Sequence, residues 1–336
     1  GRLKNINRKA NIPFASHPEA RSPESGSPLE SALSKVIRCN ARRSPPPLNK
    51  MIIAGWNGLL ISAYAKAGAI LSEPAYIEIA RSDAEYVIEK LYSIEEKKLA
   101  RGSVGNEIFG KGFCEDYIYL ARGLLDLYRA TADIQFFTMA RRIQSAADTQ
   151  FLDPYSGLYH LTPSSKIAKS PFGLWIITDG DLPSVNGIAA LNLLEIAGID
   201  GSGNARQKAR NVIRASTPEL TLSTSSCGSL ILAIDQNAHP TRQAIISGMP
   251  DDPVTRGLAA QIRQGAPGNI TLIFMDGQAG QRTLLATHPE LATFRAVEGN
   301  AKVFLCKEYQ TQSVATTPAM ATRQIRSFIG HNSKNP

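Results

Sequence analysis

The chain has few cysteines, and no two of them are close enough in sequence to form a metal-binding or redox pair. The four cysteines are Cys39, Cys114, Cys227 and Cys306. Structural zinc sites and dithiol redox centres use cysteines that lie a few residues apart. We therefore expect free thiols, as in a reducing compartment, and neither a metal ion nor another cofactor.

Long hydrophobic runs are also missing. The longest apolar stretch, residues 59–71, is interrupted by Ser62, Lys66 and Gly68. A membrane-spanning helix needs about 20 mostly apolar residues, so we predict no membrane contact and a soluble, cytoplasmic protein. The sequence starts with Gly1 instead of Met, and removal of a targeting segment before it would point to mitochondria instead.

Positive charge is in excess, but it is not concentrated. The chain has 37 Lys and Arg residues against 29 Asp and Glu residues, a net charge of +8. The basic residues are scattered, with only small groups such as Arg42-Arg43. Surfaces that bind nucleic acid combine a basic groove with stacking aromatic residues, and this combination is not present. We expect no nucleic-acid partner, whereas a carbohydrate partner, a protein partner and the oligomeric state stay open.

The motifs of several enzyme classes are absent. The sequence contains no Gly-x-Ser-x-Gly elbow, which a hydrolase triad of that type requires. Sugar epimerisation needs paired bases, generally histidines. All five histidines fall in predicted loops or chain ends: His17, His160, His239, His288 and His331. A nucleophilic triad is thus unsupported, and epimerase chemistry is disfavoured.

What the chain does contain is a repeating helical pattern. Its 43% hydrophobic and 20% charged residues are typical of a globular protein. Apolar periodicity predicts paired helices at 57–71 and 75–91, and again at 115–131 and 134–150, a repeat of about 60 residues. Further helices are expected from 186 to 198 and on to about 234. Such hairpins pack side by side, so we predict a mainly α fold, an α/α toroid of helical hairpins whose ring is complete or incomplete.

The two ends of the chain differ from this helical part. Residues 1–48 are rich in Pro, Ser, Asn and Arg and look like a linker with one short helix at 29–38. The hairpins occupy 49–239. From 240 to 325, short apolar runs at 244–247, 270–275 and 303–306 and a helix-like stretch at 254–262 predict a small α/β unit with a parallel strand pair. Residues 326–336 are expected to be a frayed tail.

Several short motifs occur together in one order. They are Trp56-Asn57-Gly58-Leu59, Gly112-Phe113-Cys114-Glu115-Asp116-Tyr117, Gly123-Leu124-Leu125-Asp126-Leu127-Tyr128 and Pro183-Ser184-Val185-Asn186-Gly187. Their combination resembles the C-terminal helical toroid of the spermatogenesis-associated protein 20-like family, whose members carry a thioredoxin-like domain before the toroid. That domain is absent from this sequence. The family's toroid is similar to those of six-hairpin glycosidases and sugar 2-epimerases, so the resemblance implies a carbohydrate-processing site by analogy of fold.

The sequence departs from the family pattern at charged positions. Where the family usually has Asp-Asp-Lys before its Trp-Asn-Gly motif, this chain has Leu48, Asn49 and Lys50. The Glu that usually precedes the Pro-Ser motif is Leu182 here. Most of the charged cluster implied by the resemblance is therefore replaced.

The remaining carboxylates are the catalytic candidates, because glycoside chemistry needs two carboxyl groups on opposite sides of the scissile bond. The catalytic candidates are Glu115, Asp116 and Asp179, with Asp181 beside them. The substrate-binding candidates are Lys50, Trp56, Asn57, Tyr117 and Asn186. Each candidate has a structural alternative: carboxylates cap helices and complement their dipoles, Asp in a turn binds its own backbone, and aromatic residues pack in cores.

Two functions remain open, and they predict different interiors. In an enzyme, Asp116 and Asp179 should meet in a polar central cavity with Lys50, Trp56 and Asn186. In a non-catalytic scaffold or binding protein, these side chains should be capped or packed. The replaced charged cluster favours the second interpretation. A gene fragment or an imperfect reading frame is a third explanation for the same departures.

Overall fold

The computed structural model describes residues 28–43, 48–163, 174–265 and 270–330. The chain divides into two compact units, Gly1–Lys50 and Met51–Pro336. The first unit contains helix α1 (Pro28–Ala41), in agreement with the short helix predicted there. Its apolar side chains at Leu33, Val36 and Ile37 are exposed. The predicted linker at 1–27 and 44–47 lies outside the described residues.

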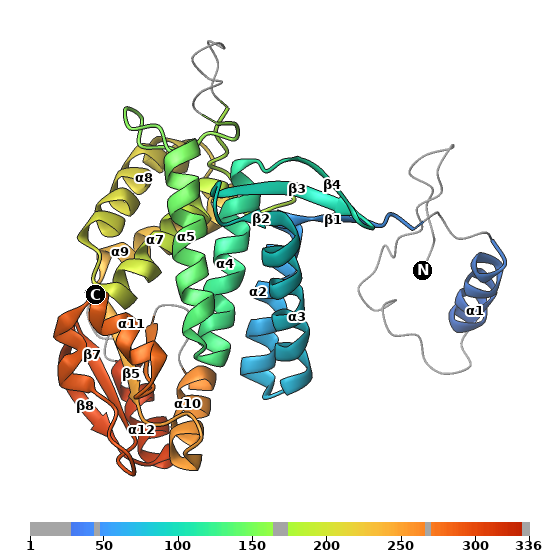
Figure 1. Ribbon diagram of the computed structural model, residues 1–336. Coiled ribbons are helices and arrows are strands. Elements are labelled where there is room, and N and C mark those ends of the chain that lie inside the picture. The colour runs from blue at the N-terminus through green and yellow to red at the C-terminus, as the bar shows by residue number, and fades with distance from the viewer. Residues whose placement is uncertain (1–27, 44–47, 164–173, 266–269, 331–336) are drawn as a thin grey trace. The chain divides into compact units, whose positions relative to one another are not determined.

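The second unit is built mainly from helices, which confirms the predicted fold class (Figure 1). Its hairpins and the helix that follows them are α2 (Ala54–Leu71) with α3 (Pro74–Leu91), α4 (Cys114–Thr131) with α5 (Ile134–Phe151), α7 (Val185–Asp200) with α8 (Gly203–Leu222), and α9 (Gly228–Ala238). Helix α4 packs between α2 and α7, and α7 also packs against α9, while α3, α5 and α8 each pack against their own hairpin partner. The described residues thus form a row of hairpins of the predicted kind.

Turn chemistry and small residues determine these helices. Ser72 and Ala132 end α2 and α4 with the left-handed φ angles of 56° and 68°, and Pro74 begins α3, where a proline costs no hydrogen bond. Helices α2 and α4 approach closely because Gly58 faces α4. A Cβ atom at Gly58 would lie 2.5 Å from the backbone nitrogen of Leu120.

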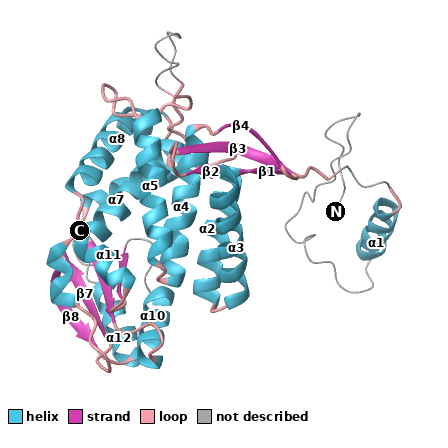
Figure 2. Ribbon diagram, viewed as in Figure 1, coloured by secondary structure: helices cyan, strands magenta, loops and turns pink. Residues whose placement is uncertain are grey.

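A small antiparallel sheet lies beside the starts of α2 and α4 (Figure 2). Its strands are β1 (Met51–Ile53), β2 (Tyr92–Ser93), β3 (Lys98–Val104) and β4 (Glu107–Lys111), with β3 paired to each of the others. None of these strands is among the elements predicted from the sequence. The strand β3 was missed because its sequence, Lys-Leu-Ala-Arg-Gly-Ser-Val, contains few β-branched or aromatic residues.

The last part of the chain is the predicted α/β unit. It contains β5 (Arg242–Ser247), α10 (Pro253–Gly265), β6 (Ile270–Met275), α11 (Ala279–Thr287), a short 3-10 helix (Pro289–Phe294), β7 (Lys302–Lys307), β8 (Gln310–Ala315) and α12 (Pro318–Gly330). The strand order is β6-β5-β7-β8, and β5 and β6 form the expected parallel pair. Helix α12 continues past Ile325, into the segment expected to fray.

This α/β unit packs against the C-terminal end of α4. The Arg263 side chain donates a hydrogen bond to the backbone oxygen of Arg129 at 2.8 Å, and Tyr128 and Phe274 make an edge-to-face ring contact at 5.6 Å. The change from helices to sheet near His239 therefore lies inside one compact unit. Within the described ranges, no helix combines the length and the apolar character needed to cross a membrane.

Candidate functional site

Most of the predicted site residues lie where the inner helices begin, and Lys50 does not. We call this region the helix-start layer: residues 53–57, 113–119, 179–187 and 228–229, at the starts of α2, α4, α7 and α9. Hydrogen bonds tie the four starts together. Gly55 binds the side chain of Asp116, Tyr119 binds the backbone of Pro183, and Asp179 binds Ser229.

Asp116 is fully buried and joins α2 to α4. Its Oδ1 accepts a hydrogen bond from the Gly55 backbone N–H at 2.9 Å. Its Oδ2 accepts bonds from the Phe113 backbone N–H and the Arg101 guanidinium, both at 2.8 Å. The bond to Phe113 is half of a capping box, because Asp116 is the third residue of α4. Burial raises the pKa of Asp116, although Arg101 and the two N–H donors oppose this rise.

Glu115 shares the same cation. Its Oε1 lies 2.6 Å from the Arg101 guanidinium, which also stacks over the Phe113 ring at 5.1 Å from the ring centre. Arg101 projects from β3, pairs with both Glu115 and Asp116, and is not among the residues predicted from the sequence. To place Arg101 against the start of α4, the sequence would have had to show that β3 is a strand and that it pairs with β1 and β4.

Asp179 connects the loop before α7 to the start of α9. Its Oδ1 accepts bonds from the Ser184 backbone N–H at 2.7 Å and the Ser229 hydroxyl at 2.6 Å. Its Oδ2 accepts a bond from the Ser229 backbone N–H at 2.8 Å. Partial burial raises the pKa of Asp179, but these donors outweigh it and hold the pKa below its usual value. The neighbouring Asp181 is exposed.

Asn186 is buried and has a bracing role in the same loops. Its Oδ1 accepts a bond from the Tyr159 N–H at 2.8 Å, and its Nδ2 donates to the backbone oxygens of Tyr159 and Ile176 at 3.1 and 3.0 Å. Ser184, and not Asn186, caps α7, because the Ser184 hydroxyl accepts the Gly187 N–H at 3.0 Å. Both the oxygen and the nitrogen of the Asn186 amide are therefore hydrogen-bonded to the backbone around it.

The other substrate-binding candidates are more dispersed. Trp56 is 53% exposed, and the Asn57 side chain donates to the backbone oxygen of Ile53 at 2.8 Å. Tyr117 is buried against Phe151, and its hydroxyl accepts the Leu99 N–H at 2.7 Å. Lys50 is exposed and belongs to the first compact unit.

Two further polar features were not predicted. Tyr119 is buried in the helix-start layer, where its hydroxyl donates to the Pro183 oxygen at 2.5 Å and burial raises its pKa. A cavity of about 680 Å³ lies beside α5, and none of the predicted site residues lines it. The part of the chain that the structure describes contains no cluster of three or more potential metal-binding side chains.

Comparison with known proteins identifies relatives but no matching family model. The chain is 28% identical over 305 residues to spermatogenesis-associated protein 20 from Homo sapiens and 26% identical over 298 residues to the protein of the same name from Rattus norvegicus. These alignments cover 88% and 86% of this chain and 38% of each relative. The chain therefore spans well under half of the length of the relatives it matches, and the resemblance seen in the motifs is confirmed.

Among solved structures, the chain is similar to an α-mannanase of glycoside hydrolase family 76 from Bacteroides thetaiotaomicron, with a TM-score of 0.43, 12% identity, and coverage of 67% of this chain and 58% of that one. It is also similar to a D-mannose isomerase, with a TM-score of 0.40, 11% identity, and coverage of 90% and 80%.

Proposed function

We propose that this chain, a relative of spermatogenesis-associated protein 20, is a non-catalytic binding protein in which the helix-start carboxylates hold the hairpins together. The observation that supports this proposal is the hydrogen bonding of Asp116 and Asp179. Both oxygens of each carboxylate accept bonds from donors of the chain itself. The ligand is a carbohydrate or another protein.

The chemistry of glycoside cleavage explains why this hydrogen bonding argues against catalysis. A general acid or base must reach the proton it transfers, within hydrogen-bond distance of the substrate. Asp116 has no exposed surface and is held by Arg101 and two backbone N–H groups. Carboxylates at helix starts also satisfy unpaired N–H groups and complement the helix dipole. A structural role therefore accounts for Asp116 and Asp179 without any substrate.

The alternative is a carbohydrate-processing enzyme, and Glu115 is the residue that favours it. The Glu115 side chain keeps 15% exposure, and Trp56 nearby on α2 presents an exposed aromatic surface of the type that stacks on sugars. Glycoside cleavage would still need a second carboxyl group.

The decisive test is to assay binding and turnover together. Purified chain is screened by thermal shift against mono- and oligosaccharides and assayed for hydrolysis and epimerisation of the same sugars, alongside Glu115→Gln, Asp116→Asn and Asp179→Asn. We expect no turnover above the background set by Glu115→Gln, and lower melting temperatures for the two Asp variants. A sugar-induced shift that persists in Glu115→Gln identifies a carbohydrate ligand, and no shift with any sugar directs the search to a protein partner.

Turnover that Glu115→Gln abolishes while the variant stays folded would show that the chain is an enzyme and that the proposal is wrong.

A further inference from the structure

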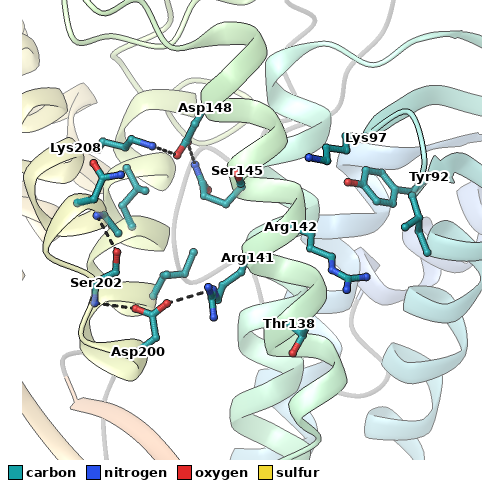
Figure 3. Close-up of a pocket in the computed structure, with 16 residues that line it drawn as sticks. Tyr92, Lys97, Thr138, Arg141, Arg142, Ser145, Asp148, Asp200, Ser202 and Lys208 are labelled. Carbon is teal, nitrogen blue, oxygen red and sulfur yellow. Dashed lines mark hydrogen bonds and ion pairs between the residues drawn. The ribbon is translucent and has the colours of Figure 1, made fainter. Parts of the chain in front are cut away.

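The cavity beside α5 has the size of a small-molecule site, and most of the residues that line it are polar. We call it the α5 groove. It is formed by α5, by β2 and the turn at 94–97 on one side of α5, and by the end of α7 and the first turns of α8 on its other side (Figure 3). Its volume of about 680 Å³ falls in the usual range for ligand pockets, roughly 300–1,000 Å³. Buried apolar side chains also line it: Leu193, Ile196 and Ala205.

Two carboxylates line the α5 groove, and the chain itself already neutralises both. Asp148 is paired with Lys208 at 2.8 Å and accepts further bonds from Gln144 and Tyr159. Asp200 is paired with Arg141 at 3.2 Å and accepts the N–H of a neighbouring residue. These four charges balance, so they leave neither an excess of positive nor of negative charge in the groove.

Two cations in the groove are not balanced in this way. Lys97 and Arg142 are exposed and have no ion-pair partner among the described residues, and Figure 3 draws no interaction for either side chain. Both lie on the Tyr92 side of α5 in that view, and the Arg142 charge opposes the rise that burial causes in the pKa of Tyr92. The adjacent Lys98 differs, since it is paired with Glu96 at 2.9 Å.

The backbone of Lys97 is held in place beside α5. Its φ angle is 53°, in the left-handed region that few residues other than Gly adopt. Its carbonyl oxygen accepts a hydrogen bond from the Gln150 side chain of α5 at 3.2 Å. The start of α8 contributes less to an anion site, because the Ser202 hydroxyl already accepts the Ala205 N–H.

We propose that the α5 groove binds a small organic phosphate, with Lys97 and Arg142 holding the phosphate group on the Tyr92 side of α5 and the organic part reaching past α5 to the apolar side chains of α7 and α8. Arg and Lys are the side chains that recognise phosphate, Arg through paired N–H donors and Lys as a point charge. The groove contains none of the helix-start carboxylates. This site therefore does not depend on the function proposed above, and either proposal can fail alone.

The test compares phosphorylated ligands with their neutral counterparts on the complete chain. Isothermal titration at low salt is run with AMP and adenosine, with glucose 6-phosphate and glucose, and with inorganic phosphate. We expect at least one of the organic phosphates to bind about tenfold more tightly than its neutral counterpart and than inorganic phosphate. Lys97→Gln and Arg142→Gln should each weaken that binding by about five- to tenfold, which corresponds to the loss of one charge-assisted contact.

Lys98→Gln is the matched control, because it removes the same charge from the neighbouring exposed residue, which does not line the groove. Its affinity should stay within about twofold of the wild type. The proposal is overturned if neither organic phosphate binds, if the neutral compounds bind equally well, or if Lys98→Gln weakens binding as much as the groove variants. If inorganic phosphate bound as tightly as the organic phosphates, the groove would recognise only the phosphate group, and the proposed contact with the organic part would be wrong.

Discussion

Helix α4 carries two polar regions whose carboxylates are neutralised in different ways. At its start, Asp116 receives two backbone N–H groups and one guanidinium. Two turns further along begins a second region, which we call the buried charge layer: Arg122, Asp126, Arg129 and Glu195, with the exposed Lys66 at its edge. There the acceptor Asp126 faces mainly cationic side chains. Arg122 pairs with Asp126 and with Glu195, Arg129 pairs with Glu195, and Lys66 lies 2.9 Å from Asp126.

The two regions shift the pKa of an aspartate in opposite directions, although both aspartates lie on α4. For Asp116, burial is the largest influence and the pKa rises. For Asp126, burial also acts to raise the pKa, but the Arg122 and Lys66 charges and the Ser62 hydroxyl outweigh it and lower the pKa far below its usual value. The family motif draws attention to the first region, whereas the larger number of buried charges lies in the second.

The largest expected effect is in the buried charge layer. Asp126→Asn leaves Arg122 with one fewer charged partner inside the protein, and breaking a buried ion pair typically costs about 3–5 kcal/mol. Urea denaturation should show this loss in the free energy of unfolding. Lys66→Gln is the control: its side chain is 55% exposed, so its loss should be below about 1 kcal/mol. Equal losses of unfolding free energy in Asp126→Asn and Lys66→Gln would mean that the buried ion pairs of this layer do not contribute more to stability than an exposed ion pair.

The next effect is expected at Gly58, between the two regions. Gly58→Ala would place a Cβ atom 2.5 Å from backbone atoms of α4, and backbone cannot move aside as the end of a side chain can. We expect a loss of about 3 kcal/mol, at the upper end for overpacking, measured by thermal and urea unfolding. Gly203→Ala is the matched control, because nothing lies within 4 Å of a Cβ atom there. A stable Gly58→Ala protein would show that α2 and α4 can separate without disturbing either region.

A smaller effect is expected in the helix-start layer. Asp116→Asn removes the negative charge that faces Arg101 and places an amide N–H₂ where one acceptor oxygen now lies. One side of the amide still accepts a hydrogen bond, so the loss should be about 1–3 kcal/mol, and less than that of Asp126→Asn. The exposed Asp181→Asn serves as a control and should leave the unfolding midpoint unchanged. If Asp116→Asn lost more unfolding free energy than Asp126→Asn, the helix-start layer would contribute more to stability than the buried charge layer.

The smallest effect is a difference in pH dependence. The lowered pKa of Asp126 gives a stabilisation that is present above the usual value of 3.8 and is lost as pH falls through the folded-state pKa. The raised pKa of Asp116 acts the other way, because stability falls as pH rises from 3.8 through its folded-state pKa. Urea midpoints between about pH 2 and 6 should therefore flatten below 3.8 in Asp126→Asn and above 3.8 in Asp116→Asn. If the urea midpoints of the wild type and both variants changed with pH in the same way, Asp126 and Asp116 would not be the source of this pH dependence.

The predicted helices match the structure closely, because their signals are local. The apolar stripe after Glu115 and the turn at 132–133 correspond to α4 and its end at Thr131. The runs at 244–247 and 270–275 correspond to β5 and β6, whose parallel pairing is also as expected. The sheet around β3 was not predicted, since its strands are short and their stabilisation comes from pairing with distant segments.

The candidate site residues come from the motifs, which point to the starts of α4 and α7. Asp116, Asp179 and Asn186 form hydrogen bonds to the backbone there. Their catalytic or binding roles stay predictions. Arg101 and the buried charge layer were missed, because single charged residues on a helix or strand carry no sign of burial in the sequence.

What the sequence alone determined is the order and type of the elements, since helix periodicity, glycine and proline act within a few residues. What only the tertiary structure decided is which donor each carboxylate meets. Gly55 and Asp116 are 61 positions apart, and Asp179 and Ser229 are 50 apart. Such contacts depend on how hairpins pack, and the same carboxylate would be a solvated acid, a cap or a buried ion according to the partners that packing supplies.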